Sequence, residues 1–138
     1  MLTAVAAKNP SATIKSVLVQ EMCFGVCEAL IGLTRDPLAG PVVTVAAGGV
    51  MAEIYQDTSV RPAPLSIETA HEMIDEVAGF ALLRGYRGSV EGDVGALAAA
   101  IATVSGLAVH RDIAEAEINP LLVRTDSVVL LDALIRKV

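Results

Sequence analysis

Aromatic side chains and clustered basic residues are scarce in this sequence. Aromatic residues make up only 3% of the 138 residues, and tryptophan is absent. The 16 acidic residues outnumber the 10 basic ones, which gives a formal net charge of -6. Nucleic acid requires a positive surface against its phosphates, so the composition argues against a nucleic-acid partner. A phosphate ligand would have to be met by a metal ion or by backbone N–H groups.

Cysteine and long hydrophobic runs are sparse as well. Cys23 and Cys27 are too few for a zinc site on their own and too close together for a disulfide framework, so we expect reduced thiols. The most apolar stretch, residues 94–109, is shorter than the roughly 20 residues that cross a bilayer and is expected to be a core helix. No basic segment followed by an apolar one opens the sequence. The cytoplasm is therefore the expected compartment, and a membrane is not an expected partner.

Small apolar residues are abundant instead. Hydrophobic residues reach 54%, mostly Ala, Val and Leu, which suggests a hidden surface such as a partner interface. The length predicts one domain. Residues 1–16 show no start signal for an element of their own and are interpreted as a truncated lead-in, whereas residues 17–138 are expected to form the domain.

The pattern along the domain is strands, then helices, then strands. Strands are expected at residues 17–22, 28–34, 41–45, 114–123 and 127–134. Ser66 and Asp93 are expected to cap two helices, the first of which ends at Gly79. Segregated strands and helices joined by short turns favour an α+β (mixed α/β) fold, with an antiparallel sheet that carries helices on one face.

Oxygen-bearing side chains are concentrated on the fourth expected strand. Alternation along a strand places Glu115, Glu117 and Asn119 on one face. If the last two strands form a hairpin with Thr125-Asp126 at its tip, counting back in steps places Asn119 opposite Asp132. Opposed residues have Cβ atoms roughly 4.5 to 5.5 Å apart, so an amide and a carboxylate in this position can hold one cation between them.

Asp132 lies within an apolar strand, where an unpaired carboxylate is costly or becomes neutral. Magnesium is one candidate partner, because it takes oxygen ligands and keeps open positions for water and phosphate. Pro120 cannot donate to a strand ladder and is expected at an edge or a bulge. The alternative to a metal is an ion pair with an arginine, which leaves the other polar residues solvated: Arg61, Arg124 or Arg136.

Several motifs resemble one protein family in their order and spacing. Glu117-Ile118-Asn119-Pro120-Leu121, followed by a strand ending in Leu131-Asp132, is similar to the metal-binding signature at the end of ATP-grasp domains. It looks most like the branch of NDP-forming acyl-CoA synthetases, which includes ADP-forming acetate-CoA ligases and succinyl-CoA synthetase β-subunits. The resemblance covers nearly the whole sequence, with further matches at residues 17–22, 32–37, 40–43, 48–49 and 61–65.

The resemblance implies roles for particular residues. Asn119 and Asp132 would be the magnesium ligands, and Glu117 would be the catalytic residue at the metal or the phosphoryl-transfer centre. Glu28 would approach the nucleotide. The hinge whose backbone reads the adenine edge would consist of Gln20, Glu21, Met22 and Cys23.

The interpretation of several other positions is less specific. Gly48-Gly49 could bring backbone N–H groups near phosphate or form a plain turn out of a strand. His71 and His110 are expected to be structural, because the phosphohistidine of the family lies in a glycine-rich setting. Three charged residues match family positions but are equally typical of a solvated ion-pair edge: Glu53, Asp57 and Arg61. Departures from the family pattern bear on the shape of the nucleotide pocket: Cys23-Phe24, Ala46-Ala47 and Gln56.

The implied function is the magnesium and nucleotide part of a ligase that joins an acid to CoA while ATP or GTP is cleaved to NDP and phosphate. The phosphate-holding lysines would lie upstream of Met1, and a CoA-binding domain or subunit of an oligomeric parent would carry the phosphohistidine. We therefore expect no ligation by this chain alone. Two alternatives remain open: a regulatory nucleotide-sensing module fused to an acetyltransferase, and a non-catalytic subunit-contact domain.

Overall fold

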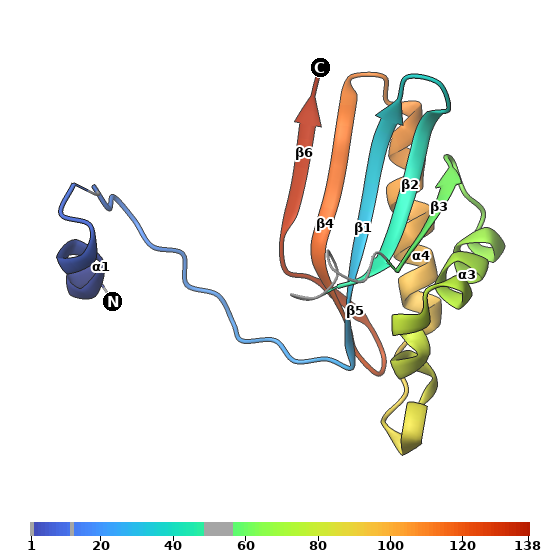
Figure 1. Cartoon of the computed structure of the whole chain (residues 1–138), viewed down its shortest axis with the longest axis horizontal. Helices are drawn as coiled ribbons and strands as arrows, with labels where there is room; N and C mark the ends of the chain where they lie inside the picture. Colours follow the sequence, from blue (N-terminus) through green and yellow to red (C-terminus); the bar gives the residue numbers. More distant parts are fainter. Residues whose placement is uncertain (1, 12, 49–56) are drawn as a thin grey trace.

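An antiparallel sheet forms the body of the molecule. The computed structural model describes residues 2–11, 13–48 and 57–138. Within these residues the sheet has the order β3-β2-β1-β4, and β5 and β6 both pair with the outer side of β4 (Figure 1). The strands are β1 (Cys27–Asp36), β2 (Gly40–Ala47), β3 (Thr58–Pro62), β4 (Ile113–Val123), β5 (Val128–Leu130) and β6 (Ala133–Lys137).

Helices cover one face of this sheet, as Figure 1 shows. The two main ones are α3 (Ile67–Glu76) and α4 (Val94–Gly106), and short 3-10 turns follow them: η1 (Ala78–Arg84), η2 (Tyr86–Gly88) and η3 (Leu107–Val109). The predicted antiparallel sheet with helices on one face, and with it the α+β class, is confirmed. No helix in the described part of the chain has the length and apolarity to cross a bilayer.

Both helix starts lie where the capping residues predict them. The Ser66 hydroxyl accepts a hydrogen bond from the Thr69 amide at 3.2 Å, and the Asp93 carboxylate accepts one from the Ala96 amide at 2.8 Å. The first helix ends earlier than predicted, because the backbone turns extended at Val77, before Gly79 is reached. The apolar stripe of α4 is buried, and a residue of η3 continues it: Leu97, Ile101 and Val104 of α4, and Ala108 of η3.

The core lies between the helices and one face of the sheet. Ile31 and Leu33 of β1 are at most 1% exposed, and they pack with Phe80 and the apolar faces of α3 and α4. Burial of one such side chain contributes about 1.5 to 3 kcal/mol. The alternate residues of β1 point to the other face, where Leu30 and Gly32 are only half-buried. No described helix covers that open face.

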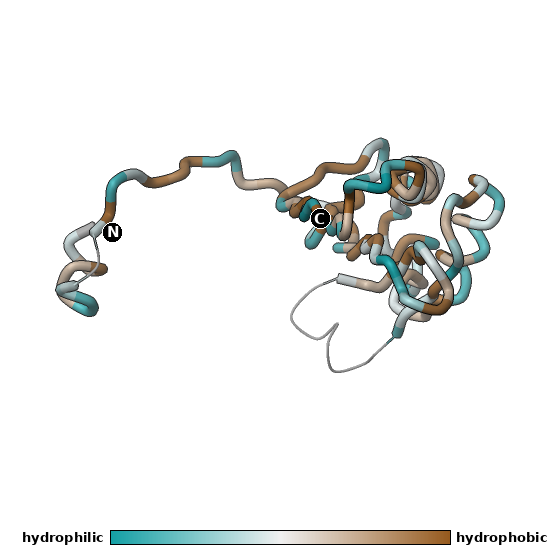
Figure 2. Tube along the Cα trace, turned by 90° about the horizontal axis from the view of Figure 1, so that it is seen from above, coloured by the Kyte–Doolittle hydropathy of each residue, from teal (hydrophilic) through white to brown (hydrophobic). Residues whose placement is uncertain are grey.

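Residues 13–25 leave the sheet as an extended arm, seen in Figures 1 and 2. The predicted strand at residues 17–22 is wrong: this segment pairs with no described strand, and Leu18 and Val19 are 80% and 87% exposed. A strand exists only with a hydrogen-bonded neighbour, which composition cannot supply. A short helix, α1 (Leu2–Lys8), precedes the arm although no element was predicted in residues 1–16.

Arg35, near the end of β1, makes hydrogen bonds to the segment that connects α4 to β4. Its guanidinium group donates hydrogen bonds to the carbonyl oxygens of Ala108 at 3.0 Å, His110 at 2.8 Å and Ile113 at 2.7 Å. Carbonyl groups at a helix end lack partners within the helix, so a cation with several donors is suited to this place. Arg35 therefore fixes where β4 begins.

We expect Arg35→Ala to lower the free energy of unfolding by about 2 kcal/mol, because hydrogen bonds to a charged group are lost together. Urea denaturation measures this change. Arg111→Ala is the matched control, since Arg111 is exposed and makes no hydrogen bond or ion pair with any described residue. Equal unfolding midpoints for the two variants would contradict the role given to Arg35.

Candidate functional site

The strand β4 pairs with β5 and β6 in the register that the numbering predicts. The Arg124 amide donates to the Ser127 carbonyl oxygen at 2.8 Å, so the turn lies at Thr125-Asp126. Further along, the Asn119 amide donates to the Asp132 carbonyl oxygen at 3.2 Å. Asn119 and Asp132 therefore face each other across the two strands, as predicted. The single strand expected at residues 127–134 is divided into β5 and β6 at this point.

A β-bulge in β4 lies beside that division. On the inner side of β4, Leu30 of β1 faces two residues, Asn119 and Pro120, because the register shifts between Ala29 and Ile31. Pro120 lacks an N–H group and takes the bulged position, as predicted. Its carbonyl oxygen still accepts a hydrogen bond from the Leu131 amide at 3.1 Å. Bulges bend a strand and re-aim its side chains, and they are frequent beside active sites.

The acidic residues of β4 lie on the open face of the sheet. Their neighbours Ala116 and Ile118 are 3% and 8% exposed and face the helices, so Glu115, Glu117 and Asn119 are on the other side. The Asn119 side-chain amide donates to Glu117 Oε1 at 3.2 Å. The sequence thus predicted correctly that these polar groups share one face.

Asp132 has no ion-pair partner in the part of the chain that the structure describes. Arg136 pairs with Glu115, Arg61 pairs with Glu76, and Arg124 makes no ion pair with a described residue. Asp132 Oδ1 accepts one hydrogen bond, from the Ala133 amide at 2.9 Å. The ion-pair alternative is therefore not realised among these residues. The expectation that Asp132 lies inside an apolar strand is wrong, because Asp132 is exposed between β5 and β6, and its carboxylate keeps oxygen lone pairs open to a ligand.

The donor set suits a magnesium ion that shares its coordination with a substrate. The described residues contain no cluster of three or more His, Cys, Asp or Glu side chains able to hold a metal ion. One carboxylate from Asp132 and one amide oxygen from Asn119 are too few to enclose an ion. Magnesium is commonly bound by one or two protein groups, with water and phosphate oxygens completing the octahedron. The pair therefore fits a metal carried with nucleotide.

A groove of about 400 Å³ opens where the arm joins the sheet. Glu28 lies on its wall and pairs in register with Leu122, which is 6% exposed. Of the four predicted hinge residues, Cys23 lines this groove. The other three lie on the exposed arm and are not brought to the groove in this structure: Gln20, Glu21 and Met22.

Gly48 forms part of the same groove and has a structural role there. Its amide donates to the Glu28 carbonyl oxygen at 2.6 Å, and a Cβ atom at Gly48 would lie 2.9 Å from the carbonyl carbon of Glu28. The amide is thus used by the backbone, as in a turn out of a strand. For Gly48, the geometry favours a turn over a contact between its N–H group and phosphate. Gly49 lies outside the described residues.

Both cysteines at this groove are free thiols, as predicted. Burial raises the pKa of the Cys27 thiol to about 11, and the nearby Glu28 carboxylate adds to that shift. A thiol with this pKa stays protonated at neutral pH and is a poor nucleophile. Cys27 is therefore a packing residue of the groove.

Comparison with known proteins shows which family this chain belongs to. Residues 1–136 match the ATP-grasp domain family. The chain belongs to that family.

The curated relatives of this ATP-grasp chain include CoA ligases. The ADP-forming acetate-CoA ligase I of Archaeoglobus fulgidus is 40% identical over 124 residues, which cover 89% of this chain and 18% of that protein. The β subunit of the ADP-forming acetate-CoA ligase I of Pyrococcus furiosus is 38% identical over 126 residues, covering 91% of this chain and 54% of the subunit. The chain thus spans about a fifth of the first relative and just over half of the second.

Solved structures show the same fold. The dinucleotide-forming acetyl-coenzyme A synthetase 1 of Ca. Korarchaeum cryptofilum, in complex with coenzyme A, Ca-AMPCP and HgCl+, superposes with a TM-score of 0.86 at 37% identity. The match covers 99% of this chain and 60% of that one. A second structure of that protein, with coenzyme A and Mg-AMPPCP and with its phosphohistidine segment pointing towards the nucleotide-binding site, gives a TM-score of 0.80 at 37% identity, covering 85% of this chain and 55% of the other.

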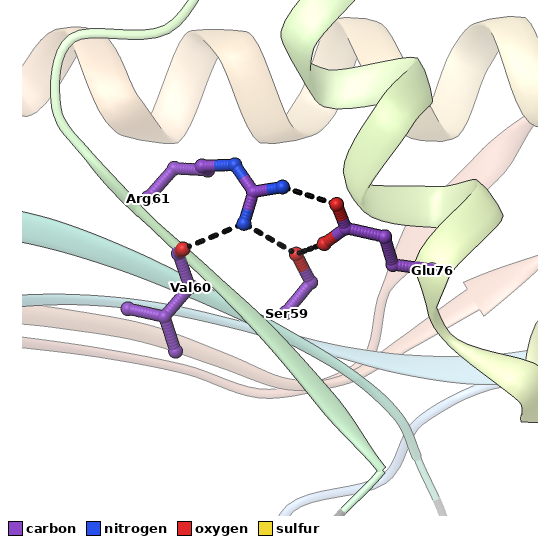
Figure 3. Close-up of polar contacts among 4 residues, drawn as sticks. All are labelled: Ser59, Val60, Arg61 and Glu76. Atoms are coloured by element: carbon purple, nitrogen blue, oxygen red, sulfur yellow. Dashed lines mark hydrogen bonds and ion pairs between the residues drawn. The ribbon is translucent and has the colours of Figure 1, made fainter.

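Two further charged residues of the ATP-grasp chain have structural partners. Arg61 of β3 donates to the carboxylate of Glu76, to the Val60 carbonyl oxygen at 3.0 Å and to the Ser59 hydroxyl at 3.5 Å (Figure 3). Its register partner Val43 is a core residue, so Arg61 points to the helix side of the sheet and away from Glu117. This geometry favours the ion-pair reading of Arg61.

The carboxylate of Asp57 also has a local role. It accepts hydrogen bonds from the amides of Ala78 at 3.1 Å and Gly79 at 2.7 Å, and so caps the start of η1. Glu53 and Gln56, the other candidates in this stretch, lie outside the described residues.

Two residues beside the candidate site were not predicted from the sequence. Gly32 of β1 lies between Glu117 of β4 and Thr44 of β2 in one row across the sheet, and Leu122 lines the groove. Alternation along β1 was the signal for Gly32, since its even-numbered residues share the face of Glu28. Leu122 gave no such signal, because the bulge changes the alternation of β4 after Pro120.

We expect Glu76→Gln to reduce the loss of stability at acid pH. The hydrogen bond from the Ser59 hydroxyl and the contact with Arg61 hold the pKa of Glu76 below its ordinary value of 4.5. A carboxyl group with a lowered pKa in the folded state adds stability above the pKa of the unfolded chain, and this contribution is lost as the pH falls through the folded pKa. The variant should therefore have a flatter stability curve below pH 4.5.

Urea unfolding across a pH series measures this difference. Glu72→Gln is the control, because Glu72 is exposed on the same helix and its side chain makes no hydrogen bond or ion pair with any residue described. Parallel pH curves for the wild type and Glu76→Gln would show that the contact is not part of the acid response.

Proposed function

We propose that this chain is the magnesium- and nucleotide-binding part of an NDP-forming acyl-CoA synthetase. The parent reaction would convert an acid, CoA and ATP (or GTP) into acyl-CoA, NDP and phosphate through phosphoryl transfer. The observation that carries the proposal is the pairing of Asn119 with Asp132, with Glu117 alongside on an open sheet face. Its relatives among ADP-forming acetate-CoA ligases support the same reaction class.

In this proposal Asp132 and Asn119 hold the metal. The hydrogen bond from the Asn119 side-chain nitrogen to Glu117 orients that amide, so that its oxygen is left to a cation. A bound magnesium ion would neutralise charge on the phosphate oxygens during transfer. Glu117, our proposed catalytic residue, both fixes the amide and presents a carboxylate oxygen at the same place.

We place the nucleoside end of the nucleotide in the groove beside Glu28. Leu122 and Glu28 both line the groove, so that it offers an apolar side chain and a hydrogen-bond acceptor, which is the combination typical of small-molecule sites. Glu28 and Gly32 are four residues apart on β1, a distance of about 13 Å along a strand. The phosphates would run along this strand towards Glu117. The role of Gln20, Glu21, Met22 and Cys23 in reading the adenine edge is part of the same proposal.

The proposed partner is a CoA-binding domain or subunit that carries the phosphohistidine, within an oligomeric parent. One of the Korarchaeum structures contains coenzyme A and has its phosphohistidine segment pointing towards the nucleotide-binding site, which supports this choice. The exposed apolar residues of the arm favour contact with another part of the same assembly: Val17, Leu18, Val19, Met22 and Phe24. A subunit-contact role thus accompanies the nucleotide site. On this proposal the chain alone does not form acyl-CoA.

We expect Asp132→Ala to weaken binding of Mg-ATP at least about tenfold, because a carboxylate ligand of the metal is lost. Titration calorimetry with Mg-ATP, repeated with EDTA, measures the effect. Asp126→Ala is the control, since Asp126 is exposed at the tip of the same hairpin. Equal binding by wild type and Asp132→Ala, or no binding by the wild type, would count against the proposal.

A further inference from the structure

Gly32 interrupts the row of side chains on the open face of the sheet. The residues of β1 that point to this face are Glu28, Leu30, Gly32 and Thr34, and Gly32 alone among them carries no side chain. It pairs with Glu117 of β4 on one side and with Thr44 of β2 on the other. A bare strip of backbone therefore lies directly beside the carboxylate that we place at the phosphoryl-transfer centre.

The fold does not require a glycine at this position. Among the described residues, a Cβ atom at Gly32 would meet only the Leu30 Cδ2 atom, at 3.9 Å, which is an ordinary contact, and the backbone is not in the left-handed region. At Gly79, by contrast, a Cβ atom would lie 2.5 Å from the Ala47 Cβ atom. Glycine inside a strand weakens it, and it often marks a place where a ligand approaches the backbone closely.

We propose that Gly32 is a positioning residue that keeps the sheet surface open for the phosphate chain of Mg-ATP. The inference rests on the proposed function and adds the path of the substrate across the sheet. Along β1, the row of Leu30 and Asn119 follows the groove of Glu28, and Gly32 lies in the next row, beside Glu117, where the proposed path of the phosphates ends. A side chain here would have its Cβ atom about 4.5 to 5.5 Å from that of Glu117, in the space that the phosphates and their metal need.

The test compares Gly32→Ala and Gly32→Val with Gly106→Ala. Gly106 is the matched control, because it has a helical backbone, no atom within 4 Å of an added Cβ atom and a place on α4, which packs on the other face of the sheet. Each variant is titrated with Mg-ATP and with adenosine, and its thermal midpoint is recorded. Adenosine lacks phosphates, so its affinity reports on the groove alone.

We expect Gly32→Val to weaken Mg-ATP binding at least about tenfold, with a smaller effect for Gly32→Ala, because added methyl groups fill the space of the ligand. The thermal midpoints should equal or exceed that of the wild type, and adenosine binding should be unchanged. Gly106→Ala should bind Mg-ATP as the wild type does.

The outcomes separate this inference from the proposed function. If Gly32→Val binds Mg-ATP normally while Asp132→Ala does not, the role of Gly32 is wrong and the metal site stands. If the thermal midpoint of Gly32→Val falls sharply, or adenosine and Mg-ATP binding fall together, the glycine serves the fold and the inference is overturned. If Asp132→Ala and Gly32→Val both bind Mg-ATP as the wild type does, or the wild type does not bind it, both proposals fail.

Discussion

The register between β4 and the two strands that follow it decides which polar groups can act together. A slip of one residue would turn Asp132 to the opposite face from the residues of β4, because side chains alternate along a strand. The short turn at Thr125-Asp126 sets this register at one end, and the ion pair between Glu115 and Arg136 lies at the other. Between them, the buried residues Ala116 and Ile118 anchor β4 on the helix side. The placement of Asn119 opposite Asp132 thus depends on the whole hairpin.

The two faces of the sheet have different tasks. Helices α3 and α4 cover one face and form the core with residues such as Ile31 and Leu33. The other face is left open in the described part of the chain, and it carries carboxylates, a bulge and a bare glycine. Features of this kind weaken a sheet, and proteins retain them where function requires it. The stabilising contacts, including Arg35 and the pair of Arg61 with Glu76, lie at the helix side and at the strand ends.

Local rules predicted much of this structure. The helix caps Ser66 and Asp93 could be predicted because each contacts an amide only three residues away. The register of the last hairpin followed from a tight turn and from counting residues back from it. The strand predicted at residues 17–22 failed for the opposite reason, since pairing depends on a distant neighbour. Arg61 matched a family position. However, the face of the sheet to which its side chain points, and its ion pair with Glu76, depend on how β3 packs on α3.

The roles of individual site residues were only partly accessible from the sequence. Alternation correctly placed Glu117 and Asn119 on one face, and Pro120, expected at an edge or a bulge, lies at a bulge. The bulge shifts the register of β4 against β1, so that Leu122 rather than Leu121 pairs with Glu28 beside the groove, which no periodic pattern could indicate. Such features arise from three-dimensional packing.

The central claim is that Asn119 and Asp132 hold one divalent ion in a site shared with nucleotide. Nuclear magnetic resonance with manganese in place of magnesium tests it most directly, because manganese takes the same oxygen ligands and broadens signals from nearby nuclei. In the presence of ATP, we predict that the backbone signals of Glu117, Asn119 and Asp132 broaden first. Broadening centred on other acidic residues, such as Asp112 or Asp126, with these three signals unchanged, would contradict the account.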